Sequence, residues 1–217
     1  MTSYQPLKIV NANMPGAPRF WREDLPPGRQ RIEYRRVVGG IGWPRMGANG
    51  AGYWCILGEE RMPDALTDTH TVRVLASGSD DSVAMLLDEA TMAASALHCG
   101  RWSAPTNEPG MRLYIEWQRN RRKLAQPCIS LAHPPNQDFA VLWELLKART
   151  KGAKALVFGE QGEELGASLR ELDAADMHSQ LSHYPAVAAL LHALGTIDLL
   201  QPQGAMTRTW HRGRAGY

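Results

Sequence analysis

The chain has 217 residues, 44% of them apolar and 21% charged, so it is long enough to bury its own core and has an ordinary globular composition. With 24 basic and 22 acidic side chains its net charge is only +2, so any nucleic-acid surface must be a local patch. Three cysteines without a Cys-x-x-Cys pair exclude a disulfide scaffold or a cysteine zinc site, and favour a reduced, cytoplasmic setting.

The first residues lack the basic-then-apolar pattern of a secretion signal, so we do not expect secretion. No stretch approaches the ~18 consecutive apolar residues that cross a bilayer, so we expect no membrane partner. Residues 1–30 instead contain five prolines, spaced closely enough to exclude a lasting helix or strand. They predict a Pro-rich, irregular arm that lies against the folded body.

Three strands are predicted next. Residues 31–41 alternate polar and apolar side chains and then become wholly apolar, which is typical of a strand entering a buried sheet; we expect it to weaken at Gly39 and Gly40. The Gly-rich run at 47–52 predicts a hairpin, because it lacks the strand-loop-helix context of a phosphate-binding loop. Further strands are predicted at 52–60 and 67–78, and the short turns favour an antiparallel meander.

Residues 79–100 predict the clearest helix. Ser79 or Asp80 is its expected cap and Gly100 its expected end. Its apolar stripe recurs at three- and four-residue spacing. The stripe consists of Val83, Leu86, Leu87, Ala90, Ala94 and Leu97. We expect Leu87, Ala90 and Ala94 to be nearly fully buried.

Two strand-and-helix pairs follow this helix. Residues 101–106 predict a short strand, and Asn107 caps a helix whose core face is Met111, Tyr114, Ile115 and Trp117. Residues 127–133 predict a fifth strand, and the helix after it carries Phe139, Leu142, Trp143 and Leu146. We expect Ile115 and Leu142 to be nearly fully buried, because each lies on an apolar stripe.

The remaining pattern is weaker. It predicts an edge strand at 154–160, a short helix at 163–173, and a last helix that starts at Pro185 and is closed by Gly195. One α/β domain over residues 31–200, followed by a basic tail at 201–217, is the domain organisation that we expect.

Three strands followed by helix, strand, helix, strand and helix is the element order of the ribonuclease H-like superfamily. Within it, three phrases resemble the C-terminal nuclease domain of phage terminase large subunits. They are VVGGIGW at 37–43, GRWSAPTNEP at 100–109 and HYPAVAALLHAL at 183–194. The resemblance spans about residues 31–195 and implies a ribonuclease H-like α/β fold, a mixed five-stranded sheet flanked by helices. It also implies a phage or prophage protein with DNA or assembly proteins as partners.

The acidic residues of that family are not matched. The family places acids on the first strand, at the end of the fourth and on a late helix, where they hold two metal ions ~4 Å apart. Here these positions offer Gly42 or its neighbours, Pro105 and Pro185. Two hypotheses follow: a DNA-binding protein with a degenerate or non-standard nuclease site, or a non-catalytic assembly or interaction domain. A third is some other α/β enzyme with a coincidental order of elements.

Acids near the expected metal site are Asp80, Asp81, Asp88, Glu89 and Glu108. If the protein is catalytic, magnesium or manganese would be the cofactor, and Asp80, Glu89 and Glu108 are the candidate catalytic residues. Capping and dipole roles are the simpler explanation of Asp80, Asp81 and Glu108, because all three lie at predicted helix starts. A solvent-exposed helix face explains the other two.

Two basic runs are candidate nucleic-acid contacts. Arg119, Arg121, Arg122 and Lys123 end a predicted helix, where they contact phosphates or simply complement the helix dipole. Arg208 and Arg212 lie in the tail beside Trp210, a mixture that suits nucleic acid or a plain basic end. His178, His183 and His192 have spacings that do not favour a zinc site, and Ser130 and His133 fall on opposite faces of one strand.

Overall fold

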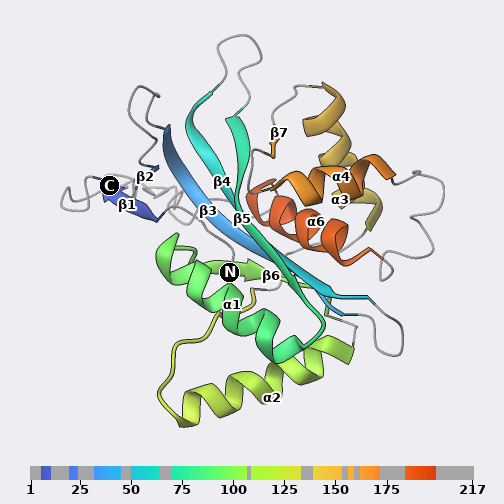
Figure 1. Ribbon diagram of the computed structural model, residues 1–217. Helices are drawn as coiled ribbons and strands as arrows, with labels where there is room; N and C mark the ends of the chain where they lie inside the picture. The colour runs from blue at the N-terminus through green and yellow to red at the C-terminus, as the bar shows by residue number, and fades with distance from the viewer. Residues whose placement is uncertain are drawn as a thin grey trace, which may run out of the picture.

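The computed structural model describes residues 6–10, 20–23, 32–44, 50–63, 70–106, 109–132, 139–152, 156–158, 162–171 and 184–198. These residues form an α/β fold in which a mixed, open sheet is flanked by helices (Figure 1). The general class predicted from the sequence is therefore confirmed.

The centre of the sheet is a meander of three long strands. β3 (Ile32–Gly42), β4 (Gly52–Pro63) and β5 (His70–Asp80) pair antiparallel in that order. β6 (Arg101–Ser103) then pairs parallel to β3, on the side away from β4. The predicted arrangement is confirmed, because short links permit antiparallel neighbours while the helix before β6 permits a parallel return.

The predicted fifth strand at 127–133 is wrong as a strand: within residues 127–132 the only pairing is an isolated parallel bridge from Leu131 to Trp102. The Ala132 N–H donates to the Trp102 carbonyl of β6 at 2.6 Å, but other backbone groups here bond to a side chain on a helix. The Tyr114 hydroxyl accepts from the N–H of Leu131 at 3.1 Å and donates to the carbonyl of Ile129 at 3.3 Å. Groups bonded in this way are not available to a neighbouring strand.

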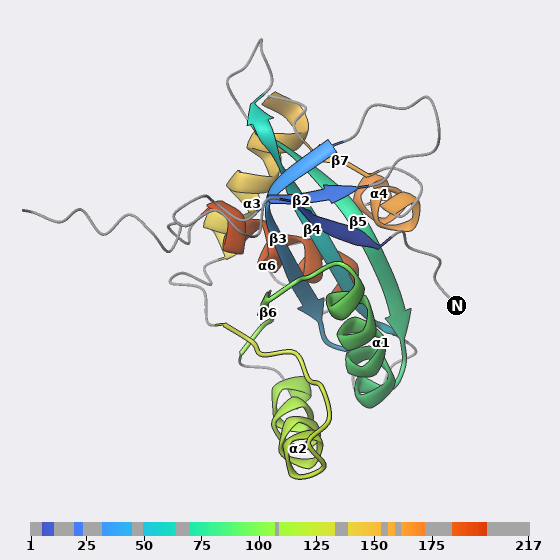
Figure 2. The same cartoon turned by 90° about the vertical axis from the view of Figure 1, so that its left-hand side faces the viewer.

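The sheet also extends further than the five strands expected, since the described residues contribute seven. β1 (Leu7–Val10) and β2 (Phe20–Glu23) form an antiparallel pair that continues onto the start of β3 (Figure 2). The prediction of no regular element in residues 1–30 is wrong there, because the prolines precede or separate these two runs without interrupting them. β7 (Leu156–Val157) pairs parallel to β5, as the predicted edge strand requires.

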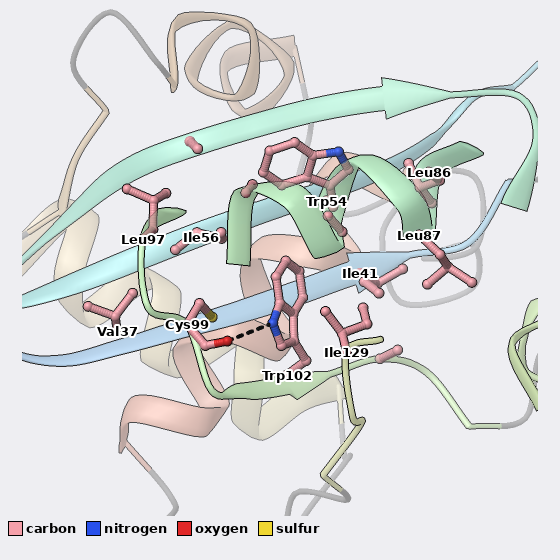
Figure 3. Close-up of a cluster of buried hydrophobic side chains, with 14 of the residues drawn as sticks. Val37, Ile41, Trp54, Ile56, Leu86, Leu87, Leu97, Cys99, Trp102 and Ile129 are labelled. Carbon is pink, nitrogen blue, oxygen red and sulfur yellow. Dashed lines mark hydrogen bonds between the residues drawn. The ribbon is translucent and has the colours of Figure 1, made fainter. Parts of the chain in front are cut away.

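One face of the sheet is covered by α1 (Val83–Ala96). Leu86, Leu87 and Ala90 are 0% exposed and pack in a cluster with Trp54 and Trp102 (Figure 3). The predicted burial of Leu87 and Ala90 is confirmed, whereas Ala94 is only half-buried.

The boundaries of α1 differ from the prediction. β5 continues through Asp80, so the cap is Ser82, and the Asp80 carboxylate accepts from the Ser82 N–H at 2.7 Å. At its C-terminus α1 ends before Gly100, and the left-handed residue is His98, with φ of 52°. The ring Nε2 of His98 lies 3.1 Å from the Leu7 carbonyl, which attaches β1 to this end of α1.

α2 (Pro109–Lys123) packs beside α1, and in both views it lies further from the sheet than α1 does (Figures 1 and 2). Its inward side chains are Tyr114 and Trp117, which are 5% and 9% exposed. The predicted burial of Ile115 is wrong, since it is 41% exposed. Successive residues of an α-helix are about 100° apart around its axis, so Ile115 points away from the face that Tyr114 and Trp117 share. Asn107, its predicted cap, lies outside the described residues.

The other face is covered by α6 (Pro185–Asp198), α3 (Phe139–Lys147) and α4 (Glu163–Glu171), with a π turn at Ala148–Gly152 after α3. Leu142 is 1% exposed, as predicted. α6 runs through Gly195, which therefore does not close it. Gly39 and Gly40 do not weaken β3 either. A Cβ on Gly39 would overlap the Trp102 ring, and one on Gly40 would overlap the backbone of Ala189 in α6.

Candidate functional site

Two of the three positions that the family resemblance singles out, Gly42 and Pro185, are in contact where β3 meets α6. A Cβ on Gly42 would overlap the Pro185 backbone at the start of α6. Beside Gly42, the indole Nε1 of Trp43 donates to the Pro105 carbonyl at 2.8 Å. The strand position and the helix start are therefore in contact. The strand exit at Pro105 is reached only by the Trp43 side chain, so the convergence of all three positions stays a prediction.

The residues at this point do not fit a two-metal site. Glycine and proline offer no carboxylate, and two divalent ions need several oxygen ligands to compensate their charge. Because α6 leaves no room for a Cβ at Gly40 or Gly42, backbone packing occupies the position of the expected acids. Within the described part of the chain, no three His, Cys, Asp or Glu side chains gather as a metal-binding group.

A buried Ser–His pair lies next to Gly40, and sequence reasoning missed it. The Ser103 hydroxyl on β6 lies 3.0 Å from Nδ1 of His192 on α6, and the two residues are 0% and 3% exposed. Burial lowers the pKa of His192 to about 4, so the imidazole is neutral near pH 7. Its role is to join β6 to α6. The residues are 89 positions apart, and no local spacing predicts their contact.

The candidate acids hold structural positions. Asp80 bonds to the backbone at the start of α1, close to the predicted capping role. The Asp88 carboxylate accepts from Trp117 Nε1 at 2.8 Å and forms an ion pair with Arg121, so it joins α1 to α2. Glu89 is half-buried on α1, Asp81 is exposed, and Glu108 lies outside the described residues.

The predicted basic residues of α2 divide into two groups. Arg121 makes intramolecular contacts: it forms an ion pair with Asp88, and its guanidinium lies 5.5 Å from the Trp117 ring centroid. Arg119, Arg122 and Lys123 are exposed and form no ion pair with any described residue. Arg208 and Arg212 lie outside the described residues.

Arg112 shares this exposed face, and sequence reasoning missed it. It precedes Arg119 by seven residues, which is close to two helical turns, so both side chains leave the same side of α2. The seven-residue spacing between the two arginines is visible in the sequence and predicts that Arg112 and Arg119 share one side of the helix. Other arginines of the described chain behave differently: Arg35, Arg36, Arg61, Arg73 and Arg149 are all paired with carboxylates.

A shallow groove of about 420 Å³ separates α1 from α2. Its apolar lining consists of Val83, Ala84, Leu113, Trp117 and Leu124. Its polar lining includes Glu116 and Asn120. Glu116 in this lining is four residues after Arg112 and seven before Lys123, so the groove adjoins the exposed cations. Leu124, which lines this groove, is 68% exposed.

Comparison with known proteins leaves the family unassigned. No protein-family model matches the chain, and no curated protein matches it in sequence. None of the helices in the described ranges has both the length and the apolar character needed to cross a membrane.

Proposed function

We propose that this chain is a DNA-binding protein of the ribonuclease H-like superfamily, related to the nuclease domain of phage terminase large subunits, with a degenerate metal site. The strand order supports the relationship, because β6 and then the Leu131 bridge continue the β5-β4-β3 meander on the β3 side. DNA and the assembly proteins of a phage or prophage are its proposed partners.

The observation that carries DNA binding is a row of cations on α2 that form no ion pair with any described residue. Arg112, Arg119, Arg122 and Lys123 are exposed on one side of a 15-residue helix. At a rise of 1.5 Å per residue, Arg112 and Lys123 are about 16 Å apart along the axis. DNA carries a phosphate about every 3.4 Å of axis along each strand, so the row can contact several phosphates of one duplex. Such contacts provide affinity without reading the base sequence.

We expect binding to double-stranded DNA of mixed sequence to weaken steeply with salt. If the four cations each neutralise one phosphate, the logarithm of the binding constant should fall with the logarithm of salt concentration with a slope of about −3.6. Changing Arg112 or Lys123 to Gln should reduce the slope by about 1 each. Fluorescence anisotropy across a salt series measures this.

Arg61→Gln is the matched control, because Arg61 is similarly exposed but is paired with Glu33 at 3.1 Å. It should leave the slope unchanged. Binding that does not respond to salt, or that Arg61→Gln weakens as much as Arg112→Gln does, would contradict the proposed DNA surface.

We expect weak or absent nuclease activity with magnesium or manganese. Gly42, Pro105 and Pro185 provide no carboxylate at the positions where the family has its acids, so two ions would lack charge compensation there. Incubation with supercoiled plasmid and either ion, followed by electrophoresis, measures cleavage. Robust cleavage that is lost in Asp80→Ala, Glu89→Ala or Glu108→Ala would instead establish a working, non-standard acid set.

The second candidate function is a non-catalytic assembly or interaction domain that keeps the fold. One observation favours it: large apolar side chains are exposed on α1 and α2. If neither cleavage nor salt-sensitive DNA binding is found, this function is the better description.

A further inference from the structure

The exposed apolar side chains of this protein gather in one layer. In the described part of the chain every large apolar residue with substantial exposure lies on α1, on α2 or directly after α2. These residues are Met85, Met92, Leu113, Ile115 and Leu124, which are between 38% and 68% exposed. Apolar groups concentrated in this way mark a surface that contacts another molecule.

The two helices each carry an outward ridge with the same spacing, whose residues are exposed except for the half-buried Glu89. The α1 ridge consists of Met85, Glu89 and Met92, and the α2 ridge consists of Ile115, Arg119 and Arg122. In both, the second residue follows the first by four positions and the third follows the second by three, so each ridge stays on one side of its helix. We call the three residues of each ridge its rungs. Along each helix axis the first two rungs are about 6 Å apart and the last two about 4.5 Å apart.

The ridges are complementary in charge. The α1 ridge has the carboxylate of Glu89 between two methionines, and the α2 ridge has the guanidinium of Arg119 next to Ile115. Neither Glu89 nor Arg119 forms an ion pair with a described residue of its own chain. Both halves of a complementary contact are therefore present on every copy of the chain.

We propose that this protein self-associates through these ridges, with the α1 ridge of one copy packed against the α2 ridge of another. Glu89 of one copy pairs with Arg119 of the next at the middle rung. The methionines cover Ile115 and the aliphatic stem of Arg122 on either side, and methionine adapts well to such a surface. The apolar rungs exclude water from the central ion pair, which strengthens it.

Sedimentation equilibrium without DNA tests this contact, so its outcome is independent of the proposed DNA binding, which also uses Arg119. The parent chain should show a mass that rises with concentration above that of one chain. Glu89→Arg alone and Arg119→Glu alone should each weaken association about tenfold or more, because like charges then face each other at the middle rung.

The decisive sample is an equimolar mixture of the two single variants. In the mixture the reversed charge of Glu89→Arg on one copy faces the reversed charge of Arg119→Glu on the other, so opposite charges meet again. Association should therefore recover, as it should in the double variant. Glu163→Arg, which reverses an exposed acid on α4 at the opposite face of the sheet, is the matched control and should associate like the parent. Circular dichroism establishes that each variant is folded.

Met92→Ser tests the apolar rungs separately and should also weaken association, since Met92 is 61% exposed and has no role in the core. A parent chain that remains a single copy at all concentrations overturns the proposal. So does association that the single charge reversals leave unchanged, or a mixture that fails to recover.

Discussion

Replacing Glu59 by Gln is expected to lower the free energy of unfolding by about 3–5 kcal/mol, because it removes one partner from a buried ion-pair cluster. Glu59 lies on β4 and is 1% exposed. Its carboxylate accepts from Arg35 at 2.7 Å and from Arg36 at 2.5 Å. The β-bulge between Tyr34 and Arg36 lets two consecutive arginines reach one carboxylate, where a regular strand would point them to opposite faces.

The cluster also holds the last helix. Arg36 donates to the carbonyl of Ile197 at 2.7 Å, close to the end of α6. Without the charge of Glu59, two part-buried guanidinium groups are left without their shared partner. Thermal and urea unfolding, followed by circular dichroism, measure the loss. Glu33→Gln, which breaks the more exposed pair with Arg61, is the control and should cost less than about 1 kcal/mol.

The effect of Glu59 should depend on pH. Burial acts to raise the pKa of this carboxyl, but hydrogen bonds from Arg35 and Arg36 outweigh burial, so its pKa lies below the ordinary 4.5. A depressed pKa in the folded state contributes stability above the unfolded pKa, and this contribution is lost as the pH falls further. The stability difference between parent and Glu59→Gln should therefore narrow below about pH 4.5. A constant difference down to acid pH would contradict the charged cluster.

Truncating Leu87 to Ala is expected to cost about 2–5 kcal/mol, because it leaves a cavity under α1. Leu87 is 0% exposed and lies in the same cluster as Ile41, Trp54 and Trp102 (Figure 3). Rings and β-branched side chains in that cluster cannot all move to fill the space. The midpoint of urea unfolding at constant slope measures the change in stability.

Leu124→Ala is the control for this truncation, since it removes the same atoms from a side chain that is 68% exposed. It should change stability by less than about 0.5 kcal/mol. If Leu87→Ala unfolds like the parent, α1 does not cover the sheet in the way described.

Much of the fold was predictable because its signals are local. The apolar stripe of α1 repeats at helical spacing, so Leu87 and Ala90 were placed in the core correctly. The short links predicted that β3, β4 and β5 pair antiparallel, and the helix before β6 predicted its parallel pairing with β3. On α2 the same reasoning failed for Ile115, because the apolar residues of that helix lie on two sides and only packing against α1 selects the inner one.

The candidate site was predictable only in part. Its basic residues were visible in sequence, but spacing does not reveal that Asp88 and Trp117 hold Arg121 while Arg119 remains exposed. No local pattern predicts the contact of Ser103 with His192 or the packing of α6 against Gly40. Both contacts join residues that are far apart in the chain.

The sequence by itself determined the order of helices and strands from β3 to α2, because periodicity and turn residues act over a few positions. It also determined that Gly42, Pro105 and Pro185 carry no acid. Only the tertiary structure decided that Gly42 contacts Pro185, which cations pair with no described residue, and which apolar residues remain on the surface of α1 and α2. Those outcomes depend on close packing between distant segments, where the fit of whole faces selects one arrangement.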